Sequence, residues 1–253
     1  KANGQDSLWK IQTTDYHGTY YGATVANGGI GILPWKEPFS IRHVMLNHVF
    51  DSATPQDVSR VLRGINPFKL QMQINGQTVN GDNISRWEQC IDMKEATHNT
   101  HFTCDGKADV SYSICALRNL PYAGLVRVEV VALGDMYLTV SNPIEIPDEY
   151  KNIGSKLVNV NVNGNDIKIV RTWALSKYRE QKVSASSAFI YDKNSSVQQQ
   201  YNGSGQISIS LKKGEKFFFT LLGAVCTGRD FIDPYNELDR EVIYGAKEEL
   251  TRL

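Results

Sequence analysis

The residue types that could support catalysis are few and widely spaced. Asp51 and Asp57 flank a polar segment, and two carboxylates can act as the acid and the base of a hydrolysis. Solvated surface carboxylates are the commoner outcome for such loop residues. His98 and His101 could bind a metal, but they fall between expected strands and no third ligand is predictable, so we expect no metal site. No nucleophile elbow or Cys/His signature is present, although distant Ser, His and Asp residues could still meet in space.

Three tryptophans could provide flat faces for a sugar ring. They are Trp35, Trp87 and Trp173, and a buried core position is the more frequent fate of such side chains. Trp35 is the best candidate for an exposed platform, because prolines and charged residues surround it. The chain has 27 basic and 27 acidic residues and no basic tract, which argues against nucleic acid and anionic membranes as partners. A neutral polyol such as a sugar suits this composition.

A glycine-rich stretch from Tyr20 to Asp51 is the most distinctive part of the sequence. A phosphate-binding loop requires a strand, then glycines, then the start of a helix. Here Ile30-Gly31-Ile32-Leu33 runs into Pro34, which prevents a helix from continuing. The stretch therefore predicts a glycine-bent pair of strands, and no nucleotide or other cofactor is expected.

Other features bear on the cellular compartment. No apolar run approaches the roughly 18 residues of a membrane span. The chain opens on KANGQDSLWK without a Met or a signal-peptide core, which we interpret as a processed or trimmed product. Its four cysteines are too few and too scattered for a disulfide scaffold, and no CxxC occurs. Cys90 and Cys104 could pair across adjacent strands; buried free thiols are the alternative. Cysteine count leaves the compartment open.

The elements that must position these residues are β-strands. Phe68, Leu70, Met72 and Ile74 alternate with polar residues, and Asn75-Gly76 then predicts a hairpin turn. Further strands follow, among them a valine-rich central strand over 125–133 and a strand over 217–222 that we expect to be buried on both faces. A strand over 40–46 is expected to end at Asn47-His48, before a long loop over 51–67. Thirteen or more strands at roughly ten-residue spacing predict an all-β sandwich or barrel.

The last residues break this pattern and predict a helix. Asp233-Pro234 forms an N-cap followed by proline at the first helical position. Leu238, Val242, Ala246 and Leu250 then recur every four residues. We therefore divide the chain into a β domain over 1–232 and the start of a helical linker over 233–253. The helix could also pack back on the sandwich, and both interpretations can hold.

Four motifs, taken in order, resemble one known family. They are Ala26 to Ile32, Leu46 to Asp51 with Val58 to Asn66, Gln89 to Lys94 with Thr100 to Thr103, and Asp233 to Leu250. Together they resemble the N-terminal domain of glycoside hydrolase family 65, which includes kojibiose, maltose and trehalose phosphorylases and related α-glucoside hydrolases. The second motif resembles the hydrolase branch of Bacteroidetes-type bacteria. Departures are His48, where relatives often have glycine, and Thr54 to Asp57, which replaces a more basic loop.

The resemblance implies a large antiparallel β-supersandwich, galactose mutarotase-like in fold, followed by a linker and an (α/α)6 catalytic barrel. The catalytic glutamate and the phosphate site of this family lie in the barrel. No catalytic residue is therefore assigned to this chain, and hydrolase cannot be told from phosphorylase.

Our first hypothesis is that the chain is the non-catalytic N-terminal domain of a secreted or periplasmic α-glucoside hydrolase. It would support its own (α/α)6 barrel and would meet α-glucoside oligosaccharides through that barrel, with Trp35, Asp51, Asp57 and Arg60 as candidate sugar contacts. One rival is a mutarotase-like aldose epimerase, which needs a His and a carboxylate on a concave sheet face. Another is a free-standing carbohydrate-binding module that depends on Trp35. The oligomeric state is left open.

Overall fold

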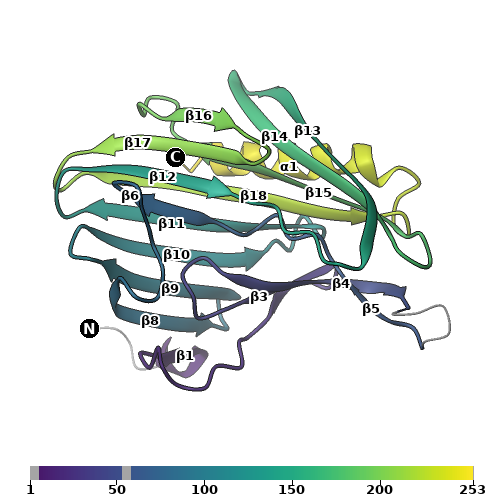
Figure 1. The fold of residues 1–253 in the computed structure, drawn as a ribbon, viewed down its shortest axis with the longest axis horizontal. Coiled ribbons are helices and arrows are strands. Elements are labelled where there is room, and N and C mark those ends of the chain that lie inside the picture. Colours follow the sequence, from purple (N-terminus) through teal and green to yellow (C-terminus); the bar gives the residue numbers. More distant parts are fainter. Residues whose placement is uncertain (1–5, 53–57, 253) are drawn as a thin grey trace.

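Eighteen strands, one short 3-10 helix (η1, Asp6–Trp9) and one α-helix form the residues that our computed structural model describes, 6–52 and 58–252. The strands form three sheets, and every neighbouring pair is antiparallel (Figure 1). This arrangement confirms the predicted all-β sandwich. Within the described ranges, no helix is long and apolar enough to cross a membrane.

The largest sheet has nine strands and forms the back of the sandwich. In spatial order they are β1 (Lys10–Thr13), β8 (Ile84–Asp92), β9 (Thr97–Cys104), β10 (Ala108–Ala116), β11 (Ala123–Ala132), β18 (Lys216–Thr227), β15 (Lys182–Tyr191), β14 (Asn165–Ser176) and β13 (Tyr150–Val162). The valine-rich segment is β11, which lies between β10 and β18 as the predicted central strand.

Two smaller sheets cover the front of the large sheet in Figure 1. One has the order β16 (Gln198–Tyr201), β17 (Gly205–Leu211), β12 (Met136–Asn142), β6 (Gln71–Ile74) and β7 (Gln77–Thr78). The other has the order β2 (Val25–Ala26), β3 (Ile30–Pro34), β4 (Ile41–Asp51) and β5 (Arg60–Arg63).

The main core lies between the large sheet and the two small ones. In β10 the side chains of Val110, Tyr112 and Ile114 are buried, and they pack with the inner faces of β6, β12 and β3. Their neighbours along the strand point away from this core, because successive side chains of a strand alternate between faces. The outward-facing residues of β8 to β11 are therefore free to form a separate surface.

Local turn chemistry determines the hairpins as predicted. Asn75 and Gly76 both have positive φ angles, 52° and 79°, in the turn between β6 and β7. Asn163 and Gly164 have 52° and 79° between β13 and β14. Asparagine and glycine tolerate this left-handed region better than other residues do.

The glycine-rich stretch folds as the predicted strand pair. Gly28 has a φ of 95° in the turn between β2 and β3. A Cβ atom added to Gly29 would lie 2.2 Å from the carbonyl oxygen of Pro121, so the two backbones approach closely there. Glycine is required at this position because any side chain would collide with backbone.

Three expectations about strands are wrong in detail. The strand predicted to end at Asn47-His48 continues as β4 to Asp51, with His48 at a φ of 61° where the ladder is irregular. The predicted loop over 51–67 contains β5, which pairs with the end of β4. Phe218 in β18 is 46% exposed, because it faces outward on a part of the sheet that no described element covers.

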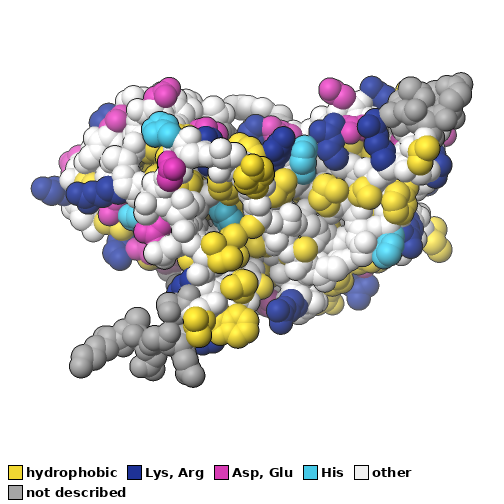
Figure 2. Space-filling view, turned by 90° about the horizontal axis from the view of Figure 1, so that it is seen from below, with side chains coloured by type: hydrophobic (Ala, Val, Ile, Leu, Met, Phe, Trp, Pro, Cys, Tyr) yellow, Lys and Arg dark blue, Asp and Glu magenta, His cyan; other side chains and the backbone are white. Residues whose placement is uncertain are grey.

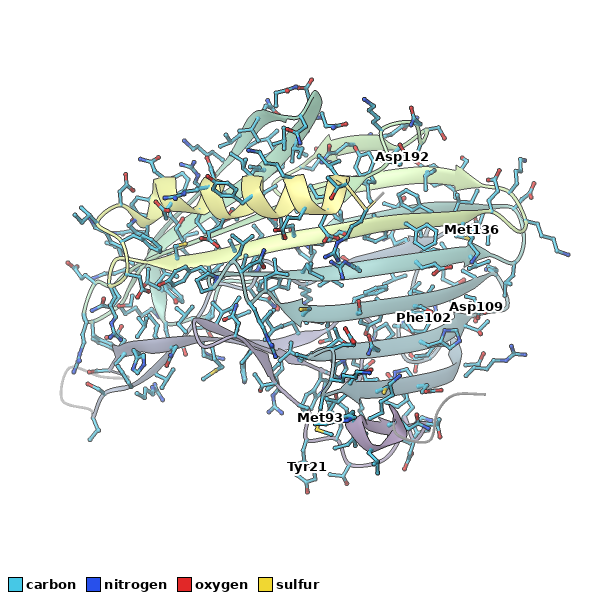
Figure 3. All side chains as sticks on the ribbon, turned by 180° about the vertical axis from the view of Figure 1, so that it is seen from behind. Tyr21, Met93, Phe102, Asp109, Met136 and Asp192 are labelled. Atoms are coloured by element: carbon cyan, nitrogen blue, oxygen red, sulfur yellow. The ribbon has the colours of Figure 1, made fainter. Side chains whose placement is uncertain are left out.

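The helix α1 (Pro234–Leu250) begins and packs as its sequence predicts. The Asp233 side chain accepts hydrogen bonds from the amides of Tyr235 and Asn236, and Pro234 occupies the first turn. Leu238, Val242 and Ala246 are fully buried against the outer face of β18, β15 and β14. Figure 3 shows α1 crossing this face of the large sheet. The helix therefore covers one half of the sheet and leaves the other half bare.

Candidate functional site

Trp35 follows β3 and is less exposed than its sequence context suggested. The Arg42 guanidinium lies over its ring at 4.4 Å from the centroid, and the Tyr20 ring meets it edge-on at 4.9 Å. Its backbone carbonyl accepts a hydrogen bond from Gln89 Nε2 at 3.0 Å. One face of the indole is thus already occupied by a cation, and a sugar could stack there only by displacing Arg42.

Asp51 is 3% exposed and serves to hold a turn. Its carboxylate accepts hydrogen bonds from the backbone amides of Ser52, Tyr178 and Arg179. Burial alone would raise the pKa of Asp51, but a hydrogen bond from the Ser176 hydroxyl and those from the three amides lower it overall. The negative charge of Asp51 therefore stabilises the turn between β14 and β15.

The predicted sugar contacts do not converge on one place. Arg60 is exposed and lies opposite Asp51 in the β4–β5 register, whereas Asp57 lies outside the described residues. Trp35 lies at the other end of β4, next to the Pro34–Ile41 pair. Since β4 has 11 residues, roughly 30 Å of strand separates the two ends.

His98 and His101 cannot share a metal ion. They are three residues apart on β9, so they project from opposite faces of the sheet. His98 is buried on the inner face and its Nε2 lies 3.2 Å from the Tyr20 hydroxyl. His101 is on the outer face, where its Nδ1 lies 3.0 Å from the Ser111 hydroxyl. Among the described residues, no group of three or more His, Cys, Asp or Glu side chains could hold a metal.

The other predicted candidates have structural roles. Trp87 is 5% exposed and donates its indole N–H to the Lys36 carbonyl. Trp173 packs on Gly154, where an added Cβ would lie 2.4 Å from the ring, and edge-on against Tyr235. Cys90 and Cys104 do not pair; all four cysteines are free thiols, two of them buried. The more exposed tryptophan is Trp9, at 52%, which the sequence analysis did not consider.

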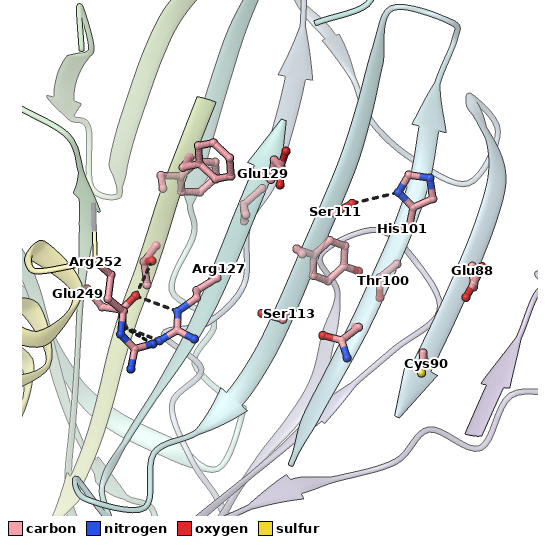
Figure 4. A pocket seen from close by; sticks show the side chains of 16 residues that line it. Glu88, Cys90, Thr100, His101, Ser111, Ser113, Arg127, Glu129, Glu249 and Arg252 are labelled. Carbon is pink, nitrogen blue, oxygen red and sulfur yellow. Dashed lines mark hydrogen bonds and ion pairs between the residues drawn. The ribbon is translucent and has the colours of Figure 1, made fainter. Parts of the chain in front are cut away.

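A large groove lies on the bare half of the large sheet. It has a volume of about 530 Å³ and lies on the outward faces of β8, β9, β10, β11 and β18, bounded by the last turn of α1 (Figure 4). Two rows of side chains run across the strands at its floor. One row is Glu88, His101, Ser111, Glu129 and Phe218; the other is Cys90, Asn99, Ser113, Arg127 and Thr220.

Ion pairs close the helix side of the groove. Arg127 forms a bidentate pair with Glu249 of α1, at 2.9 and 2.6 Å, and the Thr220 hydroxyl donates to Glu249 at 3.0 Å. Burial alone would raise the pKa of Glu249, but these hydrogen bonds lower it overall. Lys216 pairs with Glu129 at 2.9 Å. These contacts neutralise two of the three carboxylates that line the groove.

The groove does not have the geometry of a glycosidase centre. Glu88 and Glu129 lie three strands apart in the same row, which separates their backbones by roughly 14 Å. Retaining hydrolysis requires carboxyl groups about 5–5.5 Å apart, and inverting hydrolysis about 6.5–9.5 Å. Beside the groove, His101 lies close to a carboxylate of its own strand pair, with His101 Nε2 and Asp109 Oδ1 4.0 Å apart.

Sequence reasoning missed the groove because no local motif encodes it. Its residues come from five strands and the C-terminal end of α1, and Arg127 and Glu249 are 122 positions apart. The sequence did carry one signal, the alternation along each strand, which identifies the residues that point outward. Which strands are neighbours could not be read from the chain.

Comparisons with known proteins agree on one family. Residues 22–252 match the sequence profile described as glycosyl hydrolase family 65, N-terminal domain. The chain is 29% identical over 242 residues to a kojibiose hydrolase of Flavobacterium johnsoniae, covering 92% of this chain and 36% of that protein. It is 28% identical over 233 residues to a kojibiose hydrolase of Mucilaginibacter mallensis, covering 89% and 34%.

A solved structure shows the same fold. A putative kojibiose phosphorylase from the human microbiome superposes with a TM-score of 0.67 at 9% identity, covering 91% of this chain and 33% of that one. In each of these comparisons the chain spans about a third of the matched protein's length.

Proposed function

The chain belongs to the N-terminal domain family of glycosyl hydrolase family 65, and from this premise we propose that it supports the catalytic part of an enzyme acting on α-glucosides without itself catalysing hydrolysis. The observation that supports this proposal is the extent of the match. The chain aligns along nearly its whole length with about a third of each kojibiose hydrolase. The remaining two thirds of such a protein have no counterpart in this sequence.

The chemistry of the described residues agrees with a non-catalytic role. Glu88 and Glu129 are too far apart for either hydrolytic geometry. Asp51 is buried and bonded to backbone amides, and Glu249 is paired with Arg127. None of these three sites offers a free acid and base around a sugar.

The partner that we propose is an (α/α)6 barrel, and the β4–β5 hairpin is a suitable contact for it. Phe50 and Val61 pair across the hairpin and are 41% and 40% exposed, and Val58 beside them is 89% exposed. Exposed apolar side chains on a projecting hairpin favour burial against another domain. Arg60 on the same hairpin, with Trp35 as a more distant candidate, could then reach the rim of the barrel's sugar site.

The substrate and compartment are part of the same proposal. We infer an α-glucoside substrate for the whole protein from the names of its kojibiose hydrolase relatives. A secreted or periplasmic location suits an enzyme that degrades external oligosaccharides. Both inferences concern the parent protein and not this chain alone.

Glucose release by the purified chain is the direct test. Kojibiose, maltose and trehalose are incubated with it, and the Flavobacterium johnsoniae enzyme serves as the positive control. We expect no release above the buffer blank. Sustained turnover that co-purifies with the folded chain would overturn the non-catalytic assignment.

A second test addresses the support role in the parent protein. Val61→Asp places a charge on the hairpin without touching the main core, because Val61 is exposed. We expect lower thermal stability of the catalytic part and lower activity, while Tyr137→Asp, an exposed control on β12, changes neither. Equal behaviour of the two variants would exclude the hairpin as the contact.

One observation favours aldose epimerase as a second candidate. His101 and Asp109 meet on the outer face, and Glu88 lies opposite His101 in the register. A base and an acid on one sugar could open its ring by removing the proton from O1 and delivering one to O5, and the reverse transfers would close it. Polarimetry of α-glucose with and without the chain decides this, and an unchanged rate of mutarotation would eliminate the candidate.

A further inference from the structure

A second, smaller recess lies at the β1 edge of the large sheet. It has a volume of about 180 Å³ and lies between β1, the segment over 19–23 and the inner faces of β8 and β9. Its lining is uncharged throughout: Ile11, Gln12, Thr13, Thr19, Tyr20, Tyr21, Gly22, Ala23, Gln89, Cys90, Ile91 and His98. Nothing assigned to this chain so far uses it.

Two side chains of this lining carry buried polar atoms without a partner. Gln89 and His98 are 3% and 2% exposed. Within the part of the chain that the structure describes, Gln89 Oε1 and His98 Nδ1 have no hydrogen-bond partner. Almost all buried polar atoms of folded proteins are hydrogen-bonded, so two exceptions in one recess indicate that something else satisfies them.

The orientation of the Gln89 amide is determined by its neighbours. Its Nε2 donates to the Trp35 carbonyl at 3.0 Å and to the Thr100 hydroxyl at 3.2 Å. A carbonyl can only accept, so the amide cannot be reversed. Gln89 Oε1 is therefore an acceptor that awaits a donor.

His98 offers the complementary group. Its Nε2 lies 3.2 Å from the Tyr20 hydroxyl, and when that hydroxyl donates, the ring proton lies on Nδ1. Burial lowers the pKa of His98 to about 4, so the ring is neutral at physiological pH. A hydroxyl group of a ligand can accept from Nδ1–H, and a hydroxyl group can donate to Gln89 Oε1. In the other tautomer, two hydroxyl groups would donate to the two atoms.

The rest of the lining suits the carbon skeleton of a sugar. Tyr20 and Tyr21 contribute aromatic rings and Ile11 and Ile91 apolar walls, while Thr13 and Thr19 add hydroxyl groups. Tyr21 is 86% exposed and Ile11 61% exposed, and Figure 2 shows hydrophobic side chains gathered on this side of the molecule. Figure 3 shows Tyr21 at the same end of the molecule as Met93, another exposed apolar side chain. The recess is several times larger than one water molecule requires.

We propose that this recess binds a neutral sugar ring, with Gln89 and His98 hydrogen-bonded to its hydroxyl groups and Tyr20 and Tyr21 against its carbon face. A charged ligand is disfavoured because no lining residue can compensate its charge in a partly buried site. The choice of glucose as the probe rests on the proposed function; the site itself does not.

The test is an NMR titration of the whole chain with glucose. The imidazole resonances of His98 are assigned by their loss in His98→Phe. We expect a saturable shift of the His98 ring signals with a millimolar Kd, and about tenfold or more weaker binding of glucuronate, the anionic analogue of similar size. Turnover plays no part in the readout, so this test and the hydrolysis assay can fail independently.

Two variants distinguish a binding site from a water-filled recess. Ala23→Leu fills the recess without removing a hydrogen bond, and it should abolish the shift while the protein stays folded. Gln89→Met should weaken binding about tenfold, whereas Gln71→Met on an exposed position of β6 should leave it unchanged. No saturable shift with glucose, or a shift that persists in Ala23→Leu, would overturn the proposal.

Discussion

The ion pair between Arg127 and Glu249 fastens the last turn of α1 to the large sheet, and Arg127→Met tests how much it contributes. The two guanidinium–carboxylate bonds are 2.9 and 2.6 Å long. Glu249 is only 6% exposed at its side chain, whereas Arg127 is 38% exposed. The substitution keeps an apolar stem of similar length and leaves Glu249 buried without its main partner.

The magnitude follows from this unequal exposure. Removing one partner of a fully buried pair costs about 3–5 kcal/mol, and an exposed pair contributes about 0–1 kcal/mol. Glu249 keeps the Thr220 hydroxyl and has Arg252 at 3.7 Å, which reduces the loss. We expect Arg127→Met to lower the free energy of unfolding by about 2–3 kcal/mol, which corresponds to a Tm lower by about 4–12 °C for a chain of this size.

Urea denaturation at neutral pH gives the measurement, in a double-mutant cycle with Glu249→Leu. The double variant should recover most of the loss, because no charge remains buried. Lys151→Met, in the exposed pair with Glu180, is the matched control and should change stability by less than about 0.5 kcal/mol. A loss equal to that control, or strictly additive single variants, would refute the reasoning.

The pH dependence has a definite sign. Since the folded pKa of Glu249 is lowered, its contribution is present above the unfolded pKa and is lost as pH falls through the folded pKa. The stability of the unmodified chain should therefore fall more steeply in acid than that of Glu249→Leu.

Four further substitutions test three separate features by urea denaturation. Gly29→Ala should cost about 3 kcal/mol because its Cβ would collide with the Pro121 carbonyl, whereas Gly28→Ala, strained only by its φ of 95°, should cost about 1–2 kcal/mol. Asp51→Asn should cost about 2–3 kcal/mol at neutral pH, and this difference should shrink as pH falls through the lowered pKa of Asp51. Glu241 is buried with Oε2 unpartnered among the described atoms and its pKa is raised by burial, so Glu241→Gln should stabilise by about 1 kcal/mol at neutral pH and remove the loss of stability that accompanies rising pH. Equal midpoints for Gly29→Ala and Gly28→Ala, or no change in either carboxyl variant, would contradict these accounts.

Features with local causes could be predicted from the sequence. The turn at Asn75-Gly76 needs only two residues that tolerate positive φ, and the start of α1 needs only Asp233 and Pro234. The alternation of β10 was equally readable, whereas of the alternating run from Phe68 to Ile74 only Gln71–Ile74 forms a strand, β6. Errors occurred where the pattern was interrupted, as at His48, where an irregular ladder hid the continuation of β4.

The sites could not be predicted because they depend on strand order. β18 is inserted between β11 and β15, and this brings Phe218 and Thr220 beside residues nearly a hundred positions earlier. The exposure of Trp35 was overestimated for a related reason. Its charged neighbour Arg42 stacks on the indole ring rather than projecting into solvent, and a list of neighbours in sequence does not show that.

The alternation of β9 divides the chemistry of the domain between two faces. His98 and His101 look like one motif in the sequence, yet three residues of strand place His101 in the outer groove beside Asp109 and His98 in the inner recess beside Gln89. The sheet itself separates the two imidazoles, so a substitution at one should leave the other's surroundings intact. An effect of His98→Phe on mutarotation, or of His101→Asn on the recess, would thus indicate a rearrangement of β9 rather than a shared site. The two faces can be tested separately because the sheet lies between His98 and His101. For the same reason these two residues cannot bind one metal ion.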